Sequence, residues 1–268
     1  MRFFVIAQLF AVTVCARNLP KPRIPVDNPM TPDKIRLGRL LFYDKRMSVN
    51  GATCHRQELA FTDGRGCGVG ATGQMHPRGA MSLVNVAFDS SFNWADTTVH
   101  SLEEQGLRPT FSTTPLELGV QKDALLRLIQ TDDEYRPLFR RAFPNESDPY
   151  TVANVAKSIA TFERTIVSAR SPYDRFHLDG DENAISESAK RGEILFFLDR
   201  GPACFRCHGG FNFSDSAEFH NTGLYNLAGQ FSYPIPNRGL HEHTKRRDLL
   251  RVSDTTIRRK INLFADSS

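Results

Sequence analysis

Two cysteines and a histidine lie together in the stretch Cys204-Phe205-Arg206-Cys207-His208. Two thiols three positions apart, followed at once by an imidazole, have the spacing that covalent attachment of a c-type haem requires. Each thiol can add to one vinyl group of the porphyrin, and the histidine is then held beneath the iron as an axial ligand. The motif therefore predicts a haem site in which Cys204, Cys207 and His208 bind the cofactor and His208 is the iron ligand.

Three alternatives for this motif stay open at the level of sequence. The thiols could form a redox dithiol, or they could supply half of a zinc site. Zinc usually takes four ligands, however, and the sequence has no second intact Cys-x-x-Cys pair. Disulfides are a third alternative, since four cysteines follow residue 16, at positions 54, 67, 204 and 207.

A second cysteine–histidine pair, Cys54-His55, indicates that the motif is part of an internal repeat. Gly38 lies 17 residues before His55, and Gly192 lies 16 residues before His208. The agreement extends to neighbouring residues on both sides, with Leu41-Phe42 matching Leu195-Phe196 and Phe61-Thr62-Asp63 matching Phe213-Ser214-Asp215. Self-similarity of this kind predicts two related haem-binding modules.

The first copy of the repeat lacks one thiol. A cysteine at position 51 would complete a Cys-x-x-Cys-His motif, but the residue there is Gly51. We therefore expect Cys54 to form a single thioether at this site and His55 to ligate the iron. The alternative is that Cys54-His55 is an ordinary loop pair.

The N-terminus has the pattern of a secretory signal peptide at residues 1–16: Met1-Arg2, an apolar run over residues 3–14, and Cys15-Ala16. A Pro-rich linker over residues 17–30 follows. No later run approaches the length of a transmembrane helix, so we expect a periplasmic protein without a membrane span. The net charge of +4 comes with no nucleic-acid recognition motif, and we expect no nucleic-acid partner.

Helical periodicity and caps dominate the rest of the chain. Thr31-Pro32-Asp33 predicts a helix start, and residues 102–105 are helical in character before Pro109 and Pro115, which we expect to break the chain. Residues 123–143 predict one helix, and Asp148-Pro149 is expected to cap another that extends towards Ile166. No strand pattern competes. We predict an all-α protein with an N-terminal domain over residues 31–179 and a C-terminal domain over residues 180–268.

Three single residues between the modules are candidates for chemistry. His76 ends a glycine-rich loop and is either a distal residue or a solvated one. Trp94 is the only tryptophan, and a lone tryptophan is expected in the core. Glu117 lies between apolar neighbours, where a carboxyl group has a raised pKa and can act as general acid or base; the alternative is a surface glutamate opening the next helix.

Taken together, the chain resembles the bacterial di-haem cytochrome c peroxidases and, more closely, their MauG-like relatives, including the methanobactin-associated branch. The resemblance runs from about Leu37 to Thr244. It is carried by several blocks in family order: residues 41–44 (LFYD), 58–64 (ELAFTDG), 101–105 (SLEEQ), 162–165 (FERT) and 219–225 (FHNTGLY).

The resemblance implies two cytochrome c-like haem domains and assigns roles by position. His55 and His208 match the proximal ligands of a peroxide-activating N-terminal haem and of a C-terminal haem that relays electrons. Trp94 matches the tryptophan between the two haems. Gln105 and Glu117 match the distal side of the first haem, together with Pro109, and the glutamate there moves a proton between the peroxide oxygens.

Three departures from the family pattern qualify these roles. Gly51 replaces the first haem cysteine. Gly79 stands where the peroxidases carry an asparagine associated with a bridging calcium, so calcium binding is left open. After Thr244 the family continues into a long helical segment that supplies the distal ligand of the second haem, whereas residues from about 245 form a divergent basic tail. We therefore expect an incomplete second domain and weak or absent peroxide-dependent activity of the chain as written.

The function expected from the resemblance is a periplasmic di-haem c-type oxidoreductase that uses hydrogen peroxide for MauG-like oxidation of a partner protein. One alternative is a cytochrome c peroxidase that detoxifies peroxide with electrons from a small redox protein. Another is a c-type electron carrier without catalysis, or an inactive remnant.

Overall fold

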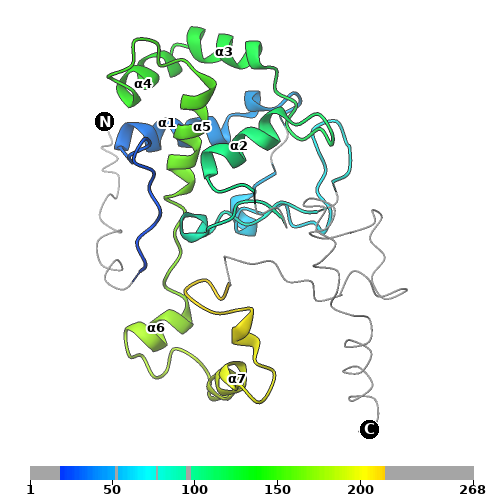
Figure 1. Cartoon of the computed structure of the whole chain (residues 1–268), viewed down its shortest axis with the longest axis vertical. Coiled ribbons are helices and arrows are strands. Elements are labelled where there is room, and N and C mark those ends of the chain that lie inside the picture. Colours follow the sequence, from blue (N-terminus) through cyan, green and yellow to red (C-terminus); the bar gives the residue numbers. More distant parts are fainter. Residues whose placement is uncertain (1–18, 52–53, 77, 95–97, 215–268) are drawn as a thin grey trace, which may run out of the picture.

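The computed structural model describes residues 19–51, 54–76, 78–94 and 98–214, and these residues form helices and irregular loops without a strand (Figure 1). The expected all-α class is confirmed. The signal peptide, the tail and the residues of the family resemblance after position 214 lie outside the described residues. The helices are α1 (Pro32–Tyr43), α2 (Leu102–Phe111), α3 (Lys122–Thr131), α4 (Tyr135–Ala142), α5 (Val152–Glu163), α6 (Pro172–Leu178) and α7 (Glu187–Phe197), with 3-10 turns η1 (Lys45–Met47), η2 (Gln57–Leu59), η3 (Val86–Phe88) and η4 (Cys204–Arg206).

Helices α1 and α5 cross at the centre of the first module. As predicted, α1 begins at an N-cap, Thr31, whose hydroxyl accepts a hydrogen bond from Lys34 N. Its residues Leu37 and Leu41 are buried in a core that also contains side chains of α3, α4 and α5. Gly38 lies against α5, where a Cβ would be 1.8 Å from Ser158 O. The missing side chain therefore sets how closely the two helices approach.

The single helix expected over residues 123–143 is wrong, because Asp132 divides it in two. The Asp132 backbone N–H closes α3 on Leu128 O. Its carboxylate then accepts hydrogen bonds from the backbone N–H groups of Glu134 and Tyr135, at 2.9 and 3.1 Å, where α4 begins. An aspartate that satisfies free N–H groups at a helix start competes with continuation of the preceding helix.

The expected break at Pro109 is also wrong, since α2 continues to Phe111. Proline removes only one backbone donor in this last turn, and the hydroxyl of Thr110 adds a hydrogen bond to Gly106 O at 2.7 Å. A third difference concerns α5, which is capped by Thr151 rather than by Asp148.

Helices α6 and α7 form a second group, at the lower end of Figure 1. Helix α6 begins with a capping box in which Ser171 and Asp174 each accept a hydrogen bond from the other residue's backbone N–H. A hydrogen bond of 2.5 Å joins His177 Nε2 of α6 to Glu193 Oε1 of α7. The domain boundary near residue 180 stays a prediction, but α6 contacts the helix that follows it.

Polar groups tie the segment before α1 to the core. Asn28 is buried and donates hydrogen bonds to Glu103 Oε1 and to Lys157 O, at 2.7 and 2.9 Å. Glu103 also accepts two hydrogen bonds from the buried guanidinium of Arg164, at 2.7 and 2.9 Å. A buried arginine with two hydrogen bonds to one carboxylate holds the start of α2 against the end of α5.

Next to this ion pair lies Glu163, a buried carboxyl group. Burial raises its pKa to about 8, an effect that the charge of Arg164 opposes. One of its oxygens, Oε2, has no hydrogen-bond partner among the described residues. Glu163 is therefore protonated at neutral pH, because the neutral form avoids an uncompensated buried charge. None of the described helices is long and apolar enough to cross a membrane.

Replacing Gly38 and Gly192, which occupy matching places in the repeat, should have opposite effects on stability. Gly38→Ala places a methyl group against a backbone carbonyl, so we expect the free energy of unfolding to fall by about 2 kcal/mol or more. A Cβ at Gly192 in α7 meets nothing within 4 Å. Gly192→Ala should therefore raise the free energy of unfolding by about 0.5–1 kcal/mol, through helix propensity alone. Urea unfolding of both variants is the measurement, and equal stabilities would contradict the close crossing.

Glu163→Gln should change the pH dependence of stability. Because folding raises the Glu163 pKa from 4.5 to about 8, its stabilising effect is complete below the unfolded pKa and is lost as pH rises through the folded pKa. We expect the wild-type melting temperature to fall from about pH 5 to about pH 8 more steeply than that of the variant. Glu104→Gln, at an exposed position of α2, is the control. Parallel curves for all three proteins would show that Glu163 is not buried as described.

Candidate functional site

The ring of His55 is oriented by a hydrogen bond of 2.6 Å between Nδ1 and Phe61 O. Because a carbonyl oxygen only accepts, Nδ1 carries the hydrogen, and the lone pair of the neutral ring lies on Nε2. Burial lowers the pKa of His55, which favours this neutral form. The side chain is therefore prepared to bind a metal through Nε2, with its other nitrogen held by the backbone.

A left-handed turn brings Phe61 O back to His55. Ala60 and Phe61 have φ angles of 53° and 59°, directly after η2. The Phe61 N–H then donates to Arg56 O at 2.9 Å, and Arg56 pairs with Thr62 in an isolated antiparallel bridge. A left-handed conformation costs a residue with a Cβ about 1–2 kcal/mol. The bridge and the histidine hydrogen bond must therefore stabilise this conformation at Ala60 and Phe61.

His208 is oriented in the same way in the second module. Its Nδ1 lies 3.2 Å from Phe213 O, and Phe213 has a φ angle of 50°. The surrounding aromatic residues match too: Phe42 and Phe61 pack edge to face with ring centroids 6.1 Å apart, and Phe196 and Phe213 do so at 5.7 Å. The internal repeat predicted from sequence thus has a counterpart in the geometry of both histidines.

The thiols beside these histidines form no disulfide among the described residues, and neither does that of Cys67. Cys204 begins the 3-10 turn η4, and the His208 N–H donates to Cys204 O at 2.9 Å, so the turn places both thiols and the imidazole on one short loop. Burial raises the pKa of Cys54, and the charges of Glu117 and Asp63 raise it further. No disulfide joins the described cysteines, and no group of three or more His, Cys, Asp or Glu among the described residues could hold a metal ion.

Position 51 is unsuited to the missing thiol. Gly51 has a φ angle of 75°, although a Cβ there would meet only the Lys45 side chain, at 3.5 Å. A cysteine would fit the space but would adopt a left-handed conformation at a cost of about 1–2 kcal/mol. The glycine therefore belongs to the local turn, and adding the thiol would strain it.

Glu117 lies in the loop between α2 and α3 and is half-buried. Helix α3 begins only at Lys122, so the alternative of a surface glutamate that opens the next helix is wrong. Burial raises the pKa of Glu117, an effect that His76 partly opposes. Among the hydrogen bonds that hold the loop are those from Ala71 N to Glu117 O at 2.7 Å and from Leu118 N to Pro109 O at 3.0 Å. The carboxyl group of Glu117 thus lies near Cys54, and its pKa is raised from the ordinary value.

His76 is closer to this site than the sequence indicated. Its ring is half-buried, with Nε2 3.3 Å from Leu116 O, next to Glu117. A solvated loop histidine was the other possibility, and it is not observed. The glycine-rich loop is what brings His76 to this position. Val69 pairs with Met75, which folds the loop back and places His76 against residues 116–117.

Gln105 and Trp94 lie on other segments than Glu117. Gln105 is half-buried on α2, whose last turn is hydrogen-bonded to the Glu117 loop. The expectation that Trp94 is a core residue is wrong, since its side chain is 43% exposed. It lies in an irregular loop, where its indole N–H donates to Gly79 O at 2.8 Å and its ring packs against Arg78. A single hydrogen bond and a cation–π contact, rather than burial, fix its position.

Gly79 does not fit an asparagine in this arrangement. A Cβ at this position would lie 2.0 Å from Arg65 O, so any larger residue would require the loop to move. The position is therefore adapted to a residue without a side chain, and the expectation left open for calcium is not tested by this contact.

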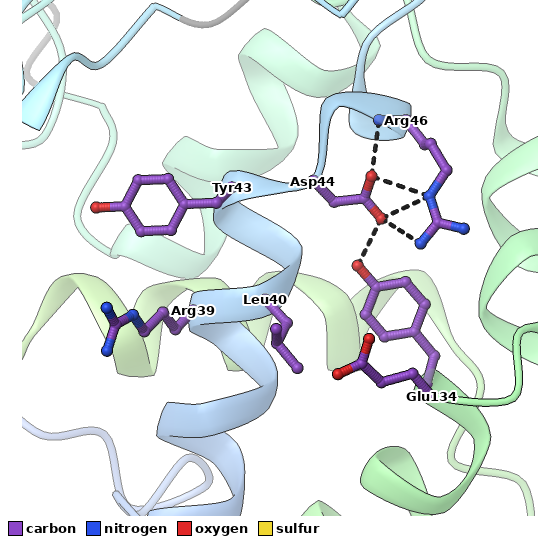
Figure 2. A pocket seen from close by; sticks show the side chains of 7 residues that line it. Arg39, Leu40, Tyr43, Asp44, Arg46 and Glu134 are labelled. Carbon is purple, nitrogen blue, oxygen red and sulfur yellow. Dashed lines mark hydrogen bonds and ion pairs between the residues drawn. The ribbon is translucent and has the colours of Figure 1, made fainter. Parts of the chain in front are cut away.

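A surface groove of about 320 Å³ lies apart from all these residues, between α1 and the start of α4 (Figure 2). Three of its polar side chains are paired with each other: Asp44 accepts hydrogen bonds from Arg46 Nε at 2.9 Å and from the Tyr135 hydroxyl at 2.7 Å. These pairs join η1 to α4, and the groove contains none of the expected site residues.

The two Cys-His loops fit haem c by the chemistry of their donors. Each offers at least one thiol outside any disulfide beside a histidine whose Nδ1 is held by the backbone. Phe42 lies 6.3 Å from the His55 ring, and in the second motif Phe205, next to Cys204, packs on Phe197. Thioether formation, ligation through Nε2 and an apolar surrounding are the requirements of such a site.

Comparison with known proteins gives one consistent result. The sequence profile of the family described as di-haem cytochrome c peroxidase matches residues 32–183. A methylamine utilization protein MauG of Methylorubrum extorquens is 40% identical over 211 residues, which cover 77% of this chain and 57% of that protein. A cytochrome-c peroxidase of Denitromonas iodatirespirans is 36% identical, covering 77% and 54%.

A solved structure agrees with these sequence matches. The crystal structure of a MauG-like protein associated with microbial copper homeostasis superposes with a TM-score of 0.78 at 39% identity, covering 87% of this chain and 70% of that one. The chain spans only 57% and 54% of the two curated relatives named above.

Haem attachment should differ between the two sites. We expect one porphyrin joined to both Cys204 and Cys207 and a second joined to Cys54 alone, when the chain is produced with haem-attachment machinery. Intact mass and peptide mapping are the measurements. Cys54→Ala should lose one porphyrin mass, whereas Cys67→Ala, the matched control, should lose none. A porphyrin joined to Cys67, or none on the Cys204 peptide, would contradict the assignment.

Proposed function

Because this chain belongs to the di-haem cytochrome c peroxidase family that includes the MauG proteins, we propose that it is a haem c oxidoreductase that uses hydrogen peroxide. The observation that carries the proposal is the pairing of two backbone-oriented histidines, each next to a thiol, with a half-buried carboxyl group near the first of them. We further propose that the mature protein works in the periplasm, where c-type haems are attached.

Five residues would hold the cofactor in this proposal: Cys54 and His55 at the first site, and Cys204, Cys207 and His208 at the second. The bound haem supplies an iron that accepts and donates single electrons. The protein's part is to fix each imidazole by its Nδ1 hydrogen bond, which directs Nε2 to the iron and makes it a stronger donor.

Glu117 is proposed as the acid–base residue of the first site. Reduction of one hydrogen peroxide to two water molecules takes two electrons and two protons. Glu117 accepts the proton of one peroxide oxygen and passes it to the other, which then leaves as water rather than as hydroxide. Its raised pKa suits both halves of this transfer near neutral pH. Gln105 and Trp94 complete the proposed site, as a distal polar group and an electron relay.

MauG-like oxidation of a partner protein is the proposed use of the oxidising equivalents. Support comes from the 40% identity with a MauG protein and from the similarity to a MauG-like structure. The second candidate is a cytochrome c peroxidase that takes electrons from a small redox protein, which the 36% identity with a named peroxidase favours. Oxidised residues on a co-purified partner would favour the first, and peroxide-dependent oxidation of a small cytochrome the second. A c-type electron carrier would show neither of these two reactions.

Glu117→Gln should slow the reaction of the haem-loaded protein with peroxide by about 10²–10⁴-fold, because the amide cannot accept and return the proton. Stopped-flow absorbance of the haem after peroxide addition is the measurement, with haem content determined in parallel and expected to be unchanged. Glu104→Gln replaces an exposed carboxylate and should react at the wild-type rate. An unaltered rate in Glu117→Gln would remove this residue from the proton transfer.

A further inference from the structure

Five aromatic side chains surround the second Cys-His loop as a chain of ring contacts. Tyr173 of α6 packs edge to face on Phe213 at 4.9 Å, and Phe213 packs on Phe196 of α7 at 5.7 Å. Phe196 contacts Phe197 at 5.1 Å, and Phe197 contacts Phe205 at 6.0 Å. Within this set Tyr173 alone carries a hydroxyl group. It is thus the member that a one-electron oxidant can oxidise most easily.

Tyr173 is also connected to the proposed iron ligand by a short route. Its ring touches Phe213, and the carbonyl of Phe213 is the acceptor of the His208 Nδ1 hydrogen bond at 3.2 Å. One residue therefore separates the phenol from the imidazole, so an electron needs to cross only one intervening side chain and its backbone.

A proton acceptor lies next to Tyr173 on the other side. Burial raises the pKa of Tyr173, and the charge of Glu193 and a side-chain hydrogen bond to it raise it further, with a smaller contribution from Asp174. Glu193 is itself fixed by His177, whose Nε2 lies 2.5 Å from Glu193 Oε1 and whose ring lies 4.3 Å from the Tyr173 ring. The Glu193 side chain is 21% exposed, so the acceptor is largely shielded from water.

From this geometry we propose that Tyr173 is a redox-active tyrosine that stores one oxidising equivalent beside the second haem site, with Glu193 as the acceptor of its proton and His177 as the residue that positions Glu193. The inference rests on the proposed function, in which hydrogen peroxide is the oxidant.

Electrons and protons balance as follows. Reduction of hydrogen peroxide to two waters requires two electrons and two protons: Tyr173 supplies one electron, the external reductant supplies the other, and both protons come from solvent. As the electron leaves, the phenolic O–H bond breaks and its proton moves to a carboxylate oxygen of Glu193, leaving a neutral tyrosyl radical. An electron from the reductant, a redox protein or an oxidisable residue of a partner protein, later restores Tyr173, and Glu193 returns the proton.

The arrangement differs from that of an ordinary packing tyrosine in this chain. Tyr43 has a similar ring contact, edge to face on Phe42 at 5.0 Å, but its hydroxyl donates to the amide oxygen of Gln57 at 3.0 Å. An amide is not a base and cannot accept the proton that oxidation releases. Tyr43 is therefore the control, because it also packs edge to face on a phenylalanine but hydrogen-bonds to an amide; its side chain is 41% exposed.

The test is freeze-quench electron paramagnetic resonance of the full haem-loaded chain after peroxide addition, with ring-deuterated tyrosine to identify a tyrosyl signal. We expect a tyrosyl radical in the wild type and in Tyr43→Phe, its loss in Tyr173→Phe, and at least about tenfold less of it in Glu193→Gln. Tyr173→Phe keeps the ring, and circular dichroism checks that each variant is folded. A tyrosyl signal that persists in Tyr173→Phe would overturn the inference.

Haem absorbance recorded on the same samples separates the two hypotheses. Haem that reacts with peroxide without a Tyr173-dependent radical leaves the proposed function intact and overturns the inference. If the haem does not react, the proposed function fails, and the same variants are then oxidised with hexachloroiridate, a one-electron oxidant that needs no peroxide. A radical that depends on Tyr173 and Glu193 under those conditions supports the inference, and its absence overturns it.

Discussion

The hydrogen bond between a histidine Nδ1 and the carbonyl of a phenylalanine downstream is the interaction on which both modules depend. It selects one tautomer, sets the plane of the imidazole and leaves the lone pair on Nε2. To make it, Phe61 and Phe213 both adopt left-handed backbone. The same two residues place their rings against Phe42 and Phe196, so one local turn orients the ligand and also packs it against the preceding helix.

The two modules support this turn to different degrees. In the first, α1 is pressed against α5 at Gly38, and Glu103 and Arg164 hold the ends of α2 and α5 together. In the second, α7 has no buried residue among the described residues, and Ile194 is 67% exposed. Helix α7 is instead fixed from α6, through the His177–Glu193 hydrogen bond. The repeat therefore preserves the histidine geometry although the surrounding contacts differ.

The carboxyl groups of the two modules are suited to two different kinds of proton transfer. The first module keeps a half-buried carboxyl group, Glu117, on a loop that is hydrogen-bonded to its neighbours, which suits transfer of a proton to and from a bound oxidant. The second places the carboxylate of Glu193 beside a phenol, which suits transfer of a proton together with an electron. Both carboxyl groups are partly buried, and burial is what raises the pKa of Glu117.

The sequence by itself determined the histidines, the thiols, the repeat and the all-α class, because these follow from residue types at fixed local spacing. It also identified Glu117 as a carboxyl group with a raised pKa. Tertiary structure decided what spacing cannot express: that α2 continues through Pro109, that Asp132 ends one helix and starts another, and that Trp94 lies at the surface. It also brought His76 to Glu117, and His177 to Glu193. These outcomes depend on contacts between residues distant in the chain or on competition between local hydrogen bonds, whose balance is set only when the helices pack.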